Sequence, residues 1–196
     1  MNDAIQITLK PKSEELMEIL ANSETIIEAV ETEDELGTIL RLHMYLETML
    51  SLYLSEMLSD EEGVFIGKIQ MFANKLNFAV ACHLPIPYAD VFNKVNEIRN
   101  KSAHRINHSL NPAEVKELAK LVNGLSVLNN ELKPVETQYI GITKFGENHK
   151  AKYGENVRFD FIMCCLTLHK EVMPFFIRTF AAIHINQQIQ SGEQHN

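Results

Sequence analysis

The chain of 196 residues is long enough to bury one hydrophobic core and short enough to form a single domain. Its hydrophobic content of 45% and charged content of 22% are those of an ordinary globular protein, and no stretch approaches the roughly 18 apolar residues of a membrane-spanning helix. The formal net charge of −8 argues against sequence-independent binding of nucleic acid over the whole surface, because such binding neutralises many phosphates. A local basic cleft is still compatible with this charge.

The predicted elements are almost all helices. Ser13 and Ser23 are suited to cap two short helices, or one interrupted helix, within residues 1–33. The strongest helix spans about residues 34–58, where apolar side chains recur at steps of three and four. A third helix is predicted over residues 64–84, after the break at "SDEEG".

The prolines of "PIPY" end the third helix and start a fourth, from about Tyr88 to about Asn107. The next helix has clear start signals: Asn111 as the cap, Pro112 at the first helical position and Glu114 where a capping-box acid belongs.

A polar loop over residues 133–156 follows, in which "QYIGITKF" could pair as a short strand or a hairpin. A long apolar helix over residues 158–190 comes next, and residues 191–196 are expected to be a flexible tail. The predicted fold is therefore all-α: a helical bundle in residues 34–190, preceded by short helices in residues 1–33.

The cysteines and histidines predict a cytoplasmic protein without metal or cofactor. Cys82, Cys164 and Cys165 form neither a disulfide framework nor a zinc pattern, which indicates reduced thiols. We expect no targeting segment at the N-terminus. His104 and His108 are four residues apart, but neither the acid nor the third ligand of a zinc site accompanies them.

The segment "NEIRNKSAHRINH" (residues 96–108) carries the candidate chemistry. On a helical wheel with about 100° per residue, Arg99 lies on the flank between an apolar face and a polar face. The apolar face contains Val91, Val95, Ile98 and Ile106, and the polar face contains Asn93, Asn96, Asn100 and His104. A solvated helix face is usually rich in Lys and Glu, so short Asn side chains favour close approach by a ligand or a second surface.

The residue types of this segment suit phosphate chemistry. Asn100 and His104 are one turn apart, and the long Arg99 side chain can reach them. An Arg holds a phosphate through a forked pair of hydrogen bonds, and a His near its ordinary pKa can accept and donate a proton. These are the parts for metal-free RNA cleavage by the 2′-hydroxyl, and a symmetric partner would supply a second copy.

The sequence "RNKSAH" (residues 99–104) resembles the motif of the HEPN superfamily, an Arg separated from a His by four to six residues. The stretch from "FANKLNFAVACHL" through "VFNKVNEIRNKSAHRI" resembles the third and fourth helices of HEPN proteins near the mannitol operon repressor family. The resemblance is firmest over about residues 35–108. It implies an up-and-down helical bundle that forms a homodimer across the helices carrying the motif. Many members are metal-independent endoribonucleases, often toxins or anti-phage effectors, whereas others are RNA-binding or regulatory modules.

The resemblance also implies residue roles. Arg99 would bind the scissile phosphate, His104 would be the general acid and base, and Asn100 would orient one of them. Glu47 is a supporting candidate, because an unpaired carboxylate on the apolar stripe of its helix would be costly; its partner would be Arg99, His104 or another bundle residue. Toxins controlled by nucleotidyltransferase antitoxins carry a Tyr where this chain has Ile106, which argues against that route of regulation.

Several alternatives stay open at the level of sequence. Lys101 and Arg105 could line a substrate path, or could simply be solvated cations. Arg99 could pair with Glu97 or Glu47, which would leave His104 as a surface residue. His43 is predicted to be a buried His with its hydrogen bonds satisfied.

Two functions are therefore predicted. The first is a homodimeric endoribonuclease, a toxin or defence effector with RNA as its substrate and an antitoxin as a partner. The alternative is a non-catalytic transcriptional regulator, or an RNA- or protein-interaction module, resembling the mannitol operon repressor.

Overall fold

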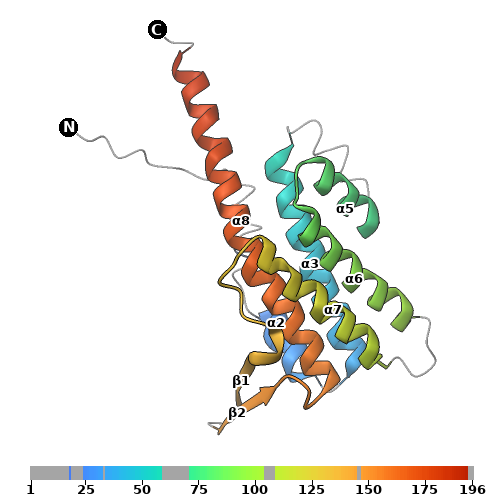
Figure 1. The fold of residues 1–196 in the computed structure, drawn as a ribbon. Coiled ribbons are helices and arrows are strands. Elements are labelled where there is room, and N and C mark those ends of the chain that lie inside the picture. Colours follow the sequence, from blue (N-terminus) through green and yellow to red (C-terminus); the bar gives the residue numbers. More distant parts are fainter. Residues whose placement is uncertain are drawn as a thin grey trace.

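The computed structural model describes Glu18 and residues 24–32, 34–58, 71–103, 109–144 and 147–193. In this part of the chain the protein is a helical bundle with one small sheet and a long C-terminal helix (Figure 1), so the predicted fold class is confirmed. The helix predicted after Ser13 lies outside the described residues apart from Glu18, as does the predicted break at "SDEEG".

The elements are close to those predicted. The helices are α2 (Glu24–Glu31), α3 (Glu35–Met57), α5 (Phe72–Ala81), α6 (Ile86–Ala103), α7 (Pro112–Gly124) and α8 (Val157–Glu193), with short 3-10 turns η1 (Leu125–Val127) and η2 (Val135–Thr137). Helix α6 begins two residues before Tyr88, because Pro87 fits the first turn, where no backbone N–H is required.

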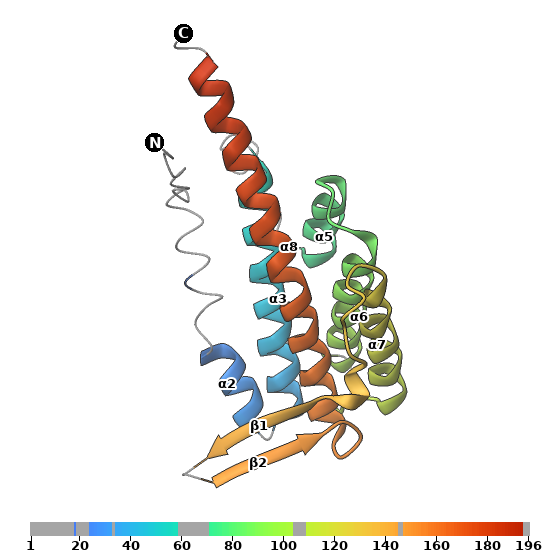
Figure 2. The same ribbon diagram turned by 60° about the vertical axis from the view of Figure 1, so that its left-hand side comes forward.

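The predicted hairpin is present. Strands β1 (Tyr139–Lys144) and β2 (Glu147–Lys152) pair antiparallel, with Tyr139 opposite Lys152. Figure 2 shows the hairpin lying across the end of the bundle where α8 begins. The polar loop predicted over residues 133–156 is therefore largely an ordered hairpin.

Helix α3 is the centre of the bundle. It contacts α2, α5, α6 and α8, and its position between these neighbours can be followed in Figures 1 and 2. Its fully buried side chains are Ile39, Leu42, Leu46, Met49, Leu50, Leu52 and Tyr53. Apolar side chains on several sides of one helix are expected where it is enclosed rather than half-exposed.

Helix α2 is attached to the bundle by hydrogen bonds to its last carbonyl groups, which have no partner within a helix. Thr38 Oγ1 of α3 donates to the carbonyl oxygen of Ala29 at 3.1 Å, and Arg158 Nη1 of α8 donates to that of Val30 at 2.9 Å. Ala29 itself is completely buried. Helix α2 is thus held at one end by both long helices.

The described helices include none that is long and apolar enough to cross a membrane. Cys82, Cys164 and Cys165 are all free thiols. Burial raises the pKa of Cys164 and Cys165 well above the ordinary value of a thiol, so both remain protonated and unreactive inside the bundle.

The N-terminus of α3 provides a test of the fold. The Asp34 carboxylate accepts hydrogen bonds from the backbone N–H groups of Leu36 (3.1 Å) and Gly37 (2.8 Å). We expect Asp34→Ala to lower the free energy of unfolding by about 1 kcal/mol, whereas Asp34→Asn, which keeps a capping oxygen, stays near the wild type. Urea denaturation of the three proteins checks this, and equal losses in both variants would contradict the assigned cap.

Candidate functional site

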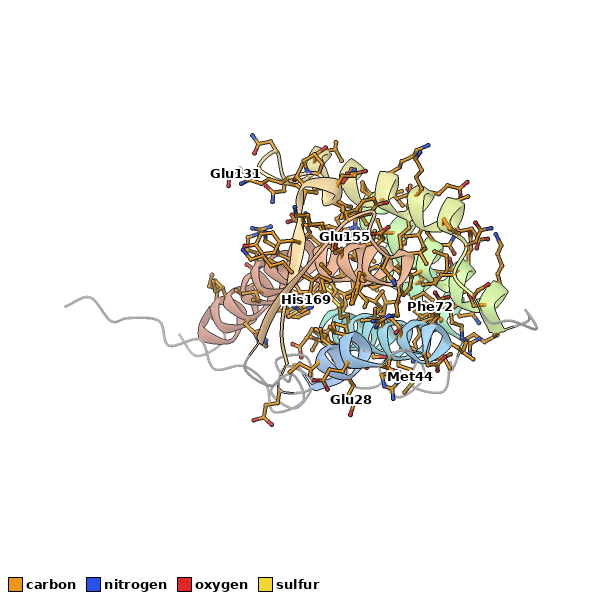
Figure 3. All side chains as sticks on the ribbon, turned by 90° about the horizontal axis from the view of Figure 1, so that it is seen from below. Glu28, Met44, Phe72, Glu131, Glu155 and His169 are labelled. Atoms are coloured by element: carbon orange, nitrogen blue, oxygen red, sulfur yellow. The ribbon has the colours of Figure 1, made fainter. Side chains whose placement is uncertain are left out.

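Helices α3, α5 and α6 enclose a cavity of about 280 Å³. Its lining residues come from α3 (His43 and Glu47), from the start of α5 (Met71, Phe72 and Ala73) and from α6 (Asn96, Arg99 and Asn100). The spacings of four on α3, and of three and four on α6, place each set on one helix face. Phe72, labelled in Figure 3, lies beside the ribbons of α3 and α6. The packing therefore brings Glu47 to the same cavity as Arg99 and Asn100.

Arg99 and Asn100 are in direct contact. Arg99 Nη1 donates to Asn100 Oδ1 at 3.0 Å, which holds the guanidinium beside the cavity. Arg99 Nε is buried and, within the described chain, has no hydrogen-bond acceptor. A buried donor without a partner costs about 1–3 kcal/mol, and such groups are rare in folded proteins. Arg99, which lines the cavity, therefore carries a hydrogen-bond donor that the described chain leaves unsatisfied.

His43 forms the inner wall of the cavity. It is 7% exposed, its Nε2 donates to Asn96 Oδ1 at 3.1 Å, and its ring lies 4.5 Å from the ring of Phe72. Burial lowers the pKa of His43 and the Arg99 charge lowers it further, although the hydrogen bond to Asn96 opposes this. The prediction of a buried His with a hydrogen-bond partner is confirmed.

Glu47 pairs with a residue of α5. Lys75 Nζ lies 2.7 Å from Glu47 Oε1 and 3.4 Å from Ser51 Oγ. Of the three partners considered from the sequence, the structure selects another bundle residue. The pair connects α3 to α5 beside the cavity, which Glu47 lines.

Two lysines of α6 that do not line the cavity, Lys94 and Lys101, form ion pairs with α7. Lys101 Nζ lies 3.0 Å from Glu114 Oε1, and Lys94 pairs with Glu117. Lys101 is therefore engaged on a different side of α6 from the cavity. His104 and Arg105 lie outside the described residues, as does His108. Among the residues that are described, no group of three His, Cys, Asp or Glu side chains could hold a metal ion.

Sequence reasoning missed part of this cavity. The wheel of α6 placed Asn96 on a polar face suited to a ligand or a second surface, without indicating that His43 of α3 is its partner. Met71 and Phe72 were not identified as lining residues at all. A helical wheel assigns residues to faces and does not identify the helix that covers a face, so periodicity contained no signal for these contacts.

No protein-family model matches this chain, and no curated protein or solved structure matches it at a significant level.

The buried His43 gives a prediction about pH. Its folded-state pKa is lowered, so protonation favours the unfolded chain, in which a His has a pKa of about 6.5. We expect the stabilising contribution of neutral His43 to be complete above pH ~6.5 and to be lost as the pH falls through the folded-state pKa. Urea denaturation at several pH values, together with NMR titration of the His43 ring, measures both quantities.

His169 needs separate control, because burial lowers its pKa as well. His43→Gln should reduce the loss of stability between neutral and mildly acidic pH, relative to wild type, while the His169 contribution stays. A wild-type His43 ring that titrates at or above 6.5 would contradict the assigned burial.

Proposed function

We propose that this protein is a metal-independent endoribonuclease in which Arg99, Asn100 and His104 form the active site. The observation that carries the proposal is the Arg99 side chain: it is held by Asn100 at the edge of a cavity, and its buried Nε has no acceptor in the described part of the chain. A phosphate oxygen is the acceptor that best matches a guanidinium, because it can take a charge-assisted and forked pair of hydrogen bonds.

The reaction follows from the chemistry of the three side chains. A base removes the proton of the ribose 2′-hydroxyl, and the 2′-oxygen forms a bond to phosphorus while the bond to the 5′-oxygen breaks. An acid protonates the departing 5′-oxygen, which leaves a 2′,3′-cyclic phosphate and a 5′-hydroxyl. Arg99 stabilises the charge that develops on the phosphate. His104 serves as acid or base, and a second copy of the chain supplies the other His.

Glu47 has a supporting role in this proposal. Its ion pair with Lys75 holds Glu47 in the lining of the cavity that also contains Arg99. Because Glu47 pairs with Lys75, the Arg99 guanidinium has no carboxylate partner among the described residues, which favours an external anion as its ligand. The resemblance of "RNKSAH" to the HEPN motif supports the same assignment of roles.

A second candidate function is a non-catalytic regulator or interaction module. The cations of α6 next to Arg99 favour it, because Lys94 and Lys101 are paired with Glu117 and Glu114 of α7. Paired cations contribute little to binding a nucleic-acid backbone. The pairing of these cations and the net charge of −8 both favour a protein over a nucleic acid as the binding partner.

RNA cleavage in the presence of EDTA tests the first function. We expect the wild type to cleave RNA and to leave 2′,3′-cyclic phosphate ends. We expect His104→Ala to reduce the rate by about 10²–10⁴-fold, the usual contribution of an acid–base residue. Arg99→Lys, which keeps the charge and loses the fork, should also be strongly impaired. Gel separation of a labelled RNA, with mass analysis of the products, provides the measurement.

Lys116→Ala is a matched control, because Lys116 is an exposed cation on α7 outside the cavity. Cleavage that persists in both active-site variants would contradict the assignment of Arg99 and His104 as active-site residues. A wild type without cleavage activity, whose expression is harmless to growth, would support the regulator instead. Growth arrest on expression that His104→Ala relieves would support a toxin.

A further inference from the structure

A second cavity of about 330 Å³ lies where α8 meets the start of α6 and the turn after η1. Its polar lining consists of Tyr88 of α6, Asn129 of the turn, and Lys170, Glu171 and Arg178 of α8. Tyr88 and Arg99 are separated by about three turns of α6, roughly 16 Å along its axis. This cavity is therefore distinct from the site proposed for RNA.

The mouth of the second cavity is cationic. Lys170, Pro174 and Arg178 follow one another at steps of four and so share a face of α8, and all three are exposed. In the chain as described, neither Lys170 nor Arg178 has a carboxylate within ion-pair distance, whereas Lys75 and Lys101 are paired. Two unpaired cations at one cavity attract an anion locally, although the net charge of the chain is −8.

The inner end of the cavity offers hydrogen-bond acceptors. Glu171 is 7% exposed, and its carboxylate accepts from Asn129 Nδ2 at 2.8 Å. A carboxylate has room for further donors, and an under-satisfied buried charge is costly. Pro174 has no N–H, so the backbone carbonyl of Lys170 receives no hydrogen bond from it along the helix.

Tyr88 connects the two ends of the cavity. Its hydroxyl donates to the backbone carbonyl of Glu171 at 3.0 Å. Burial and the Glu171 charge raise the pKa of Tyr88, while the Arg178 charge lowers it. The hydroxyl therefore stays protonated at neutral pH and lies within the electrostatic influence of both the acidic and the basic side chain. A ligand in this cavity would meet positive charge outside and acceptors inside.

The volume of the cavity suits a single small-molecule ligand. Small-molecule sites usually measure about 300–1,000 Å³, so 330 Å³ is near the lower limit. Leu128 and Pro174 add apolar surface to the lining, which suits the face of a planar ring. A free amino acid would leave much of the volume empty. A nucleoside monophosphate has an anion at one end and N–H donors on a planar base at the other.

We propose that this cavity binds a nucleoside monophosphate, with its phosphate at Lys170 and Arg178 and its base facing Glu171. Guanine is the preferred base, because its edge presents two adjacent N–H donors to the two oxygens of a carboxylate. Adenine presents one amino group. This inference shares no residue with the proposed RNA-cleaving site.

Calorimetric titration of the full chain with GMP, AMP and inorganic phosphate tests the proposal. GMP is expected to bind more tightly than AMP, and AMP more tightly than phosphate. Lys170→Ala and Arg178→Ala should each weaken GMP binding about tenfold or more, since each removes a charge-assisted contact. Glu171→Gln keeps an oxygen for Asn129 and should weaken GMP binding while affecting AMP less.

Lys120→Ala provides the matched control, because Lys120 is an exposed cation on α7 outside the cavity; its GMP affinity should equal that of the wild type. Thermal unfolding of every variant verifies that the bundle is intact. The proposal is overturned if GMP does not bind, if it binds no more tightly than AMP or phosphate, or if both cation variants keep wild-type affinity. Absence of GMP binding would leave RNA cleavage by Arg99 and His104 unaffected as a proposal, and the reverse also holds.

Discussion

The enclosure of α3 is the constraint on which the rest of the structure depends. A helix surrounded by α2, α5, α6 and α8 must pair each polar side chain it carries within the bundle, because a buried polar group without a partner is costly. Four of its polar side chains each bond a different neighbouring segment: Thr38 to Ala29, His43 to Asn96, Glu47 to Lys75 and Tyr53 to the carbonyl of Cys82. The polar residues of α3 therefore position the surrounding helices.

The candidate RNA site follows from this arrangement. The contact between His43 and Asn96 sets the distance between α3 and α6 at the level of Arg99. With α5 fixed by Lys75, the three helices leave a cavity instead of closing completely. Arg99 is half-buried by this packing, and its Nε is left without an acceptor in the described structure. The unsatisfied donor is thus a result of how the helices pack, and the proposed phosphate contact rests on it.

The cavity proposed to bind a nucleoside monophosphate is formed mainly by residues of α8. Pro174 interrupts the hydrogen-bond ladder of α8 without ending the helix. Next to it, Glu171 is buried against Asn129 and Tyr88, while Lys170 and Arg178 remain exposed. One helix thereby contributes both an inner acceptor and an outer pair of cations.

The sequence by itself determined the helices, because caps, prolines and periodicity are local properties. Asp34 and Asn111 mark helix starts as predicted, and the apolar stripe places His43 inside the bundle. The motif from Arg99 to His104 could likewise be recognised from residue types and spacing. Only the tertiary structure decided which residues meet: Glu47 pairs with Lys75, Asn96 faces His43, and Lys101 turns toward Glu114. The physical reason is that periodicity fixes the face on which a residue lies, whereas its partner depends on how whole helices pack and rotate against one another.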